Sequence, residues 1–148
     1  MTPIRESVEI ARRPEDVFAY LDDYSRHTEW QANLVSARID TEGPIKVGTR
    51  VTEVRRMGKR EQPVSIEITE HDPPRSFAFR GTEGPIRPVG TGTIEPIGDG
   101  SSSRFTLELD LVGHGFGKII APMARKQAAA QIPVNQQKLK ELLESGKA

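Results

Sequence analysis

Apolar and polar residues alternate with a period of two through most of the chain, a pattern typical of strands that bury one face. The alternation is clearest at residues 64–69, where valine and isoleucine alternate with polar side chains. Turn signals rich in glycine, proline and aspartate separate the alternating segments. The pattern predicts an antiparallel sheet of about seven strands, at residues 4–10, 34–39, 48–57, 64–69, 77–79, 90–97 and 105–111.

Two short helices are predicted between the first and second strands. At the first, Pro14 suits the opening turn, and the carboxylates of Glu15 and Asp16 suit the positive end of the helix. Ser25 is the expected N-cap of the second helix, which reaches about Trp30.

The segment from about 116 to 145 changes to the period of an amphipathic helix. We expect one stripe of this helix to cover the sheet, and the stripe consists of Phe116, Ile119, Ile120, Met123, Gln127, Ala130 and Val134. Beyond Pro133 the apolar positions slip around the helix by roughly 130°, to Leu139, Leu142 and Leu143. Because proline removes a helical hydrogen bond, we expect a kink or a break near Pro133. The elements together predict an α+β fold.

Composition narrows the class of protein. A chain of 148 residues has the size of one domain, so we expect a single domain over residues 1–148. The absence of cysteine excludes disulfides and thiolate metal sites. Lys+Arg and Asp+Glu both number 21, and this neutral balance disfavours a nucleic-acid partner. The sequence has neither a secretory signal nor an apolar run long enough to span a membrane, so we expect a cytoplasmic protein.

Several motifs give the chain a family resemblance. They are residues 8–18 (VEIARRPEDVF), residues 24–30, Gly48-Thr49-Arg50, residues 72–77 (DPPRSF) and residues 139–144. On these, the chain resembles the START and birch-pollen-allergen-like helix-grip superfamily (SRPBCC), and in particular its polyketide cyclase/dehydrase-type branch. The resemblance implies a helix-grip fold, in which an apolar ligand lies between the curved sheet and the terminal helix.

The side chains also favour an incompletely filled interior. A curved sheet and a straight helix leave a wide gap, yet the chain has only five Phe, one Trp, two Tyr and three Met to fill it. The centre of the helix offers mostly small residues. The residues expected to line a ligand cavity are Phe18, Trp30, Ile66, Ile68, Phe77, Phe79, Thr93, Phe105, Leu107, Leu109, Met123, Gln127 and Ala130. The alternative is that these side chains pack on one another in a dry core. We place Trp30 at the expected mouth.

Candidates for chemistry are few. His114 lies in the glycine-rich segment before the terminal helix, where an imidazole could serve as an acid or a base. Glu53 and Arg55 alternate on the same side of their strand as Val51 and Met57, and both would enter the cavity if that side faces inward. The alternation fits the opposite orientation almost equally well, and in that orientation both side chains lie in solvent. The histidine spacing gives no metal site, and we expect no cofactor. No nucleophile arrangement and no phosphate-binding loop is present.

Three functions remain open. The first is binding or transport of a small apolar molecule, lipid-like or polyketide-like. The second is an enzyme of the polyketide cyclase/dehydratase type that would use the same cavity. The third is a protein-interaction module resembling the co-chaperone-like members of the superfamily. The sequence favours the first because no acid–base pair converges, and it does not indicate an oligomeric state.

Overall fold

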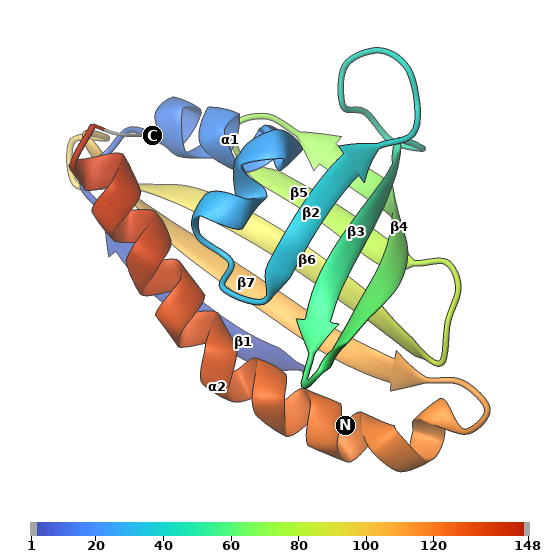
Figure 1. The fold of residues 1–148 in the computed structure, drawn as a ribbon. Coiled ribbons are helices and arrows are strands. Elements are labelled where there is room, and N and C mark those ends of the chain that lie inside the picture. Colours follow the sequence, from blue (N-terminus) through green and yellow to red (C-terminus); the bar gives the residue numbers. More distant parts are fainter. Residues whose placement is uncertain (1–2, 147–148) are drawn as a thin grey trace.

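A computed structural model describes residues 3–146 and shows one seven-stranded antiparallel sheet with a long helix along it (Figure 1). The strand order is β1-β7-β6-β5-β4-β3-β2. The strands are β1 (Ile4–Ile10), β2 (Leu34–Ile39), β3 (Arg50–Met57), β4 (Arg60–Asp72), β5 (Ser76–Gly81), β6 (Ile86–Ile97) and β7 (Ser102–Gly113). The helices are α1 (Pro14–Asp22), the 3-10 helix η1 (Tyr24–Glu29) and α2 (Gly117–Glu144). The predicted α+β helix-grip architecture is confirmed.

The two short helices follow β1 as predicted, with one change at their junction. Pro14 occupies the first turn of α1, and Glu15 and Asp16 supply its acidic start. The N-cap of η1 is Asp23 and not Ser25, because the Asp23 side chain accepts a hydrogen bond from the Ser25 backbone N–H. The observed N-cap therefore lies two residues before the predicted one, and its side chain is a carboxylate, which suits the same role.

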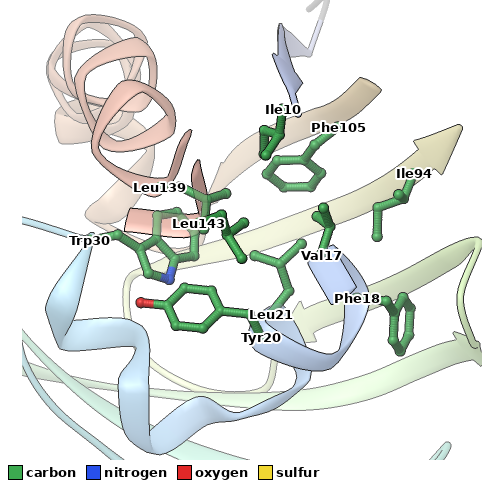
Figure 2. Packing of buried hydrophobic residues seen from close by; sticks show 10 residues of the cluster. All are labelled: Ile10, Val17, Phe18, Tyr20, Leu21, Trp30, Ile94, Phe105, Leu139 and Leu143. Atoms are coloured by element: carbon green, nitrogen blue, oxygen red, sulfur yellow. The ribbon is translucent and has the colours of Figure 1, made fainter. Parts of the chain in front are cut away.

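The main apolar core lies between α1, the C-terminal half of α2 and the first strands of the sheet order (Figure 2). Leu139 and Leu143 of α2 meet Trp30 and Tyr20 there. The buried members are Ile10, Val17, Phe18, Tyr20, Leu21, Trp30, Ile94, Phe105, Leu139 and Leu143. A second, smaller cluster of Tyr24, Val51, Ile66 and Ile68 lies at the β3–β4 side. Both clusters lie on the concave face of the sheet.

The face that α2 turns toward the sheet differs from the predicted one. Its buried residues are Gly117, Ala121, Ile132, Asn135, Gln136, Leu139 and Leu143. At about 100° per residue these positions fall on one side of the helix, opposite the apolar stripe that the sequence favoured. Phe116, Ile119, Met123 and Val134 are instead exposed to solvent. The prediction was wrong because the true inner face is made largely of small and amide side chains, which hydrophobic periodicity does not mark.

Helix α2 runs without a break through Pro122 and Pro133. The leucines at its end therefore reach the core without re-aiming the helix, since Leu139 and Leu143 share the face of Gly117 and Ala121. A break at Pro133 is excluded, and a kink within the continuous helix stays a prediction. No helix in the described part of the chain has the length and apolar character needed to cross a bilayer.

Glycine controls the junction between β7 and α2. A Cβ on Gly117 would collide with the backbone carbonyl of Pro85, and a Cβ on Gly113 would meet the backbone of Gly117. The His114 backbone N–H also donates to the Pro85 carbonyl at 2.8 Å. The start of α2 can therefore lie against the β5–β6 connection only because two glycines leave room for it.

The orientation of α2 can be tested with two neighbouring positions. Ile132 is 7% exposed and Val134 is 60% exposed. We expect Ile132→Ala to lower the free energy of unfolding by about 3 kcal/mol because it leaves a cavity. Val134→Ala should change it by less than about 0.5 kcal/mol. Urea denaturation followed by circular dichroism measures both, and equal losses would contradict this orientation.

Candidate ligand-binding site

The concave face of the sheet holds most of the apolar residues predicted to line a cavity. Register places Ile94 opposite Phe105, Gly92 opposite Leu107 and Gly90 opposite Leu109, so these positions share one face. Ile66, Ile68, Phe105, Phe18 and Trp30 are packed in the two buried clusters, as the dry-core alternative expects. The other members remain partly exposed, namely Phe77, Phe79, Leu107 and Leu109, together with Val64 and Leu111. Phe77 and Leu107 pack against the main core, and Phe79 and Val64 pack against the second cluster. Leu109 and Leu111, which approach the start of α2, belong to neither cluster, so this end of the concave face is incompletely covered.

Four predicted lining residues lie elsewhere. Thr93 pairs with Thr106 on the opposite face of the sheet, one residue out of phase with Ile94. Met123, Gln127 and Ala130 lie on α2, on the side away from its buried residues. Trp30, which we expected at the mouth, is instead buried in the main core. It is the one residue of the described chain whose buried side-chain N–H lacks a hydrogen-bond partner.

Two phenylalanines of β5 lie flat over two glycines of β6. A Cβ on Gly90 would collide with the ring of Phe79, and a Cβ on Gly92 would collide with the ring of Phe77. The cross-strand pairs are direct, with Phe79 opposite Gly90 and Phe77 opposite Gly92. The rings therefore occupy the space that side chains on β6 would fill. The two rings therefore form an aromatic floor on the concave face, and they lie close to the β6 backbone.

A charged pair faces the same interior from β3. Glu53 is only 5% exposed, although it is a carboxylate. Arg55 Nη2 donates to Glu53 Oε1 at 3.0 Å, and the guanidinium is about one quarter exposed. Glu53 shares its phase with Val51, which is fully buried. Of the two strand phases that the sequence allowed, the inward phase of Glu53 and Arg55 is therefore the observed one.

The loop after η1 fixes the guanidinium of Arg55. Nη2 also donates to Gln31 Oε1 at 2.8 Å, and Nη1 donates to Asn33 Oδ1 at 3.1 Å. Three acceptors on two segments therefore determine where the charge lies. Since a buried charge is tolerated only when it is paired and hydrogen-bonded, this network explains why β3 can carry the pair inside.

Tyr24 and His27 of η1 complete the polar cluster. Their rings stack with centroids 4.3 Å apart, and the His27 ring lies 5.5 Å from that of Trp30. A 3-10 helix has three residues per turn, so Tyr24, His27 and Trp30 fall on one face of η1, and all three are buried. This spacing of three was visible in the sequence and could have identified Tyr24 and His27 as interior residues. Gln31 and Asn33, in contrast, had no such signal.

The hydrogen bonds of His27 define its protonation. Its Nε2 lies 2.7 Å from the Leu21 carbonyl, which can only accept, so Nε2 carries the proton. Nδ1 accepts from Gln31 Nε2 at 3.3 Å. Burial lowers the pKa of His27 and outweighs the opposing effects of the Leu21 carbonyl and Glu53. His27 is therefore a neutral imidazole with both nitrogens engaged.

The Tyr24 hydroxyl is less acidic than that of an ordinary tyrosine. Burial raises its pKa, and the negative charges of Glu53 and Asp22 raise it further. The hydroxyl makes no hydrogen bond to any residue between 3 and 146. Arg55 is likewise the one described donor that reaches the Glu53 carboxylate, although a carboxylate can accept about four hydrogen bonds. The cluster thus retains unused donor and acceptor capacity.

The remaining histidines lie outside this cluster. His114 is exposed in the loop between β7 and α2. His71 is partly buried: its Nε2 lies 2.9 Å from Asp22 Oδ1 and its ring contacts Phe18 edge-on. No group of three or more His, Asp and Glu side chains in the described chain could hold a metal ion. Of the three candidate catalytic residues, the structure therefore brings together Glu53 and Arg55.

Two surface hollows lie away from the polar cluster. One, of about 670 Å³, is on the convex face and is lined by charged side chains, among which Glu67 pairs with both Arg50 and Arg80. The other, of about 370 Å³, lies beside α1, where Phe18 and Asp22 face Pro73 and Pro74.

Comparison with known proteins identifies the family. Residues 1–144 match the family described as polyketide cyclase / dehydrase and lipid transport, and the chain belongs to it. None of the curated proteins matches the sequence significantly.

Solved structures with low sequence identity share the fold. A START superfamily protein from Mycobacterium smegmatis is 13% identical with a TM-score of 0.81, and 98% of this chain and 99% of that chain align. A protein from Thermus thermophilus is 19% identical with a TM-score of 0.80, over 99% of both chains. The Zhui aromatase/cyclase from Streptomyces sp. R1128 is 17% identical with a TM-score of 0.74, over 97% of this chain and 92% of that chain. These likenesses establish the helix-grip architecture.

The buried imidazole should make stability depend on pH. The unfolded chain binds a proton on His27 near pH 6.5, whereas burial lowers the pKa in the folded state. The unfolded state then binds more protons, so the free energy of unfolding should fall as the pH drops below about 6.5, by at most about 1.4 kcal/mol per pH unit. We expect His27→Gln to flatten this decline in urea titrations between pH 5 and 7.5.

The matched control is His114→Gln at the exposed histidine. It should leave the pH dependence of the free energy of unfolding as in the wild type. A decline that survives His27→Gln unchanged would show that another group is responsible.

Proposed function

We propose that the protein binds a small, largely apolar molecule against the concave face of the sheet, with a polar end of the molecule at the Glu53–Arg55 pair. The observation that carries this proposal is the combination on one face of partly exposed apolar side chains and a buried, incompletely bonded carboxylate. Family membership supports it, because the family description includes lipid transport.

The apolar part of the proposal rests on Phe77, Phe79, Leu107 and Leu109. Each is only partly covered by the protein, so a guest molecule could remove further apolar surface from water. Burial of such surface contributes about 25 cal/mol per Å². The flat phenylalanine rings over β6 suit a planar or extended guest, since nothing projects from the glycines beneath them.

The polar part of the proposal rests on Glu53 and Tyr24. Glu53 has acceptor capacity that Arg55 does not use, and Tyr24 supplies a hydroxyl without a described partner. A hydroxyl group on the guest would satisfy the carboxylate, and a carbonyl would satisfy the phenol. Ligand sites of this kind are mostly apolar and gain their specificity from a few placed polar groups.

A second candidate function is catalysis of the polyketide cyclase/dehydratase type. The observation in its favour is that Glu53 and Arg55, a base and a fixed cation, face an otherwise apolar surface. A chain of alternating ketones presents acidic CH₂ groups to a carboxylate and carbonyl oxygens to a guanidinium. The aromatase/cyclase Zhui has the same fold, which makes this reaction class a reasonable alternative.

Binding can be tested with added ligand probes and with substitutions on β7. Native mass spectrometry of the purified protein would show a co-purified molecule, and dodecanol, oleic acid and emodin serve as added probes. We expect at least one of them to raise the Tm and to change the fluorescence of Trp30, which is the only tryptophan. Leu109→Gln should weaken that binding about tenfold, because it places an amide on the apolar floor.

The matched control for this substitution is Val112→Gln, on the convex face of the same strand. It should leave the affinity unchanged. Absence of both a co-purified molecule and any thermal shift would count against binding, as would equal effects of the two variants.

The catalytic alternative calls for a separate measurement. We expect a reactive linear poly-β-keto thioester, incubated with the protein and analysed by mass spectrometry, to yield a cyclised product if the protein is an enzyme. Glu53→Gln should then reduce turnover at least about a hundredfold by removing the base. His114→Ala is the comparison variant. No product above the uncatalysed background would reject this alternative and leave the binding proposal standing.

A further inference from the structure

Half of the exposed large hydrophobic side chains of the described chain lie at one place, on and just before α2. We call them the outer apolar stripe, and they are Phe116, Ile119, Ile120, Met123 and Val134. Ile119 is 82% exposed and Met123 is 68% exposed. Single exposed apolar residues need no explanation, but a contiguous exposed group marks an interaction surface.

The stripe occupies one side of the helix. At about 100° per residue, Ile119, Met123 and Val134 fall within about 60° of one another. Ala121 and Ile132, which are buried, point the opposite way. At a rise of about 1.5 Å per residue the stripe extends for about 27 Å along the helix. Four of its members lie between 116 and 123, and the exposed Gln127 and Ala130 separate them from Val134 on the same side. The fold leaves this narrow surface without a partner, and its apolar character is concentrated at the start of α2.

The charge around the stripe has a single sign. Between Asp110 and Glu141 the sequence contains no acidic residue, although it contains Lys118, Arg125, Lys126, Lys138 and Lys140. Arg125 pairs with Asp110, and Lys140 pairs with Glu144. Lys118, Lys126 and Lys138 form no ion pair with any residue between 3 and 146. At about 100° per residue, Lys126 and Lys138 flank the stripe on its two sides, whereas Lys118 lies on the side of the buried Gln136. In a chain of zero net charge, this helix is locally basic.

We propose that the outer face of α2 docks on the surface of an anionic lipid bilayer. In this arrangement α2 lies parallel to the membrane plane, the apolar stripe enters the boundary between headgroups and acyl chains, and Lys126 and Lys138 contact anionic headgroups. An interfacial helix has this combination of an apolar strip and flanking cations. Each lysine close to an anionic surface adds to the attraction.

The charge of α2 argues against a second copy of the chain, which is the other partner that an exposed apolar strip suggests. A second copy of the chain would have to bring the same surface against itself in a two-fold contact. Such a contact would place the lysines of one copy near those of the other, with no acidic residue between 111 and 140 to balance them. An anionic bilayer supplies the missing negative charge and also covers the whole length of the stripe.

This inference rests on α2 alone and does not require the proposed ligand site. The two are related in space, because the same helix turns Ala121 toward the sheet and Met123 toward solvent. A protein docked in this way would hold the incompletely covered end of its concave face close to the membrane.

Vesicle co-sedimentation tests the proposal on the intact protein. We expect binding to vesicles of phosphatidylcholine and phosphatidylglycerol in a ratio of about 7:3, and little binding to pure phosphatidylcholine. Ile119→Ser combined with Met123→Ser should weaken binding by about tenfold or more. Lys126→Gln combined with Lys138→Gln should weaken it about thirtyfold at low salt, and about 0.5 M NaCl should have a similar effect.

Val47→Ser combined with Val89→Ser is the matched control, because it removes two exposed valines from other surfaces. This variant should bind like the wild type. Circular dichroism and the Tm check that all variants are folded, and the soluble probes emodin and oleic acid check the concave face independently. Absence of binding to anionic vesicles would overturn the proposal. So would binding that both α2 variants retain, or a dimer in size-exclusion chromatography that Ile119→Ser and Met123→Ser dissociate.

Discussion

The gradient of side-chain size along the inner face of α2 is the constraint on which the remaining structure depends. The face begins with Gly117 and Ala121 and ends with Leu139 and Leu143. The large end can fill the space above Ile10 and Phe105, and the main core forms there. The small end cannot fill the equivalent space above Leu109 and Leu111, which remain partly exposed. One helix therefore closes one end of the curved sheet and leaves the other incompletely covered.

Hydrogen bonds from a loop explain how the interior tolerates a charged pair. A carboxylate on β3 would be costly to bury, because the free energy lost on desolvation would exceed what one ion pair contributes. Gln31 and Asn33 hold the guanidinium of Arg55 while it donates to Glu53. The same loop is tied to the C-terminal half of α2, where the Ala32 backbone N–H donates to Asn135 Oδ1. The interior around Glu53 is therefore stabilised by hydrogen bonds as well as by apolar packing.

The sequence predicted the number and order of elements because alternation and turn residues are local properties. It failed where the decisive face carries few apolar side chains. Thr93 was placed one residue out of phase because its neighbours on the true inner face include Gly92, which has no side chain to mark it. The face of α2 was inverted because glycine, alanine and amides form much of its inner side. Strand β3 had two plausible phases, and only its pairing with β2 and β4 brings Val51 and Glu53 inside.

The state of the buried groups favours holding a molecule over transforming one. General acid–base catalysis needs a group that can take up and release a proton near the working pH. Both nitrogens of His27 are engaged, and burial keeps it neutral. Burial and Glu53 also raise the pKa of Tyr24, which keeps its proton in place. What the cluster offers is a fixed acceptor, a fixed donor and a fixed cation above an aromatic floor. A rigid array of this kind could orient a guest without reorganising, so the geometry supports the proposed binding more directly than proton transfer, which would require Glu53 to act alone.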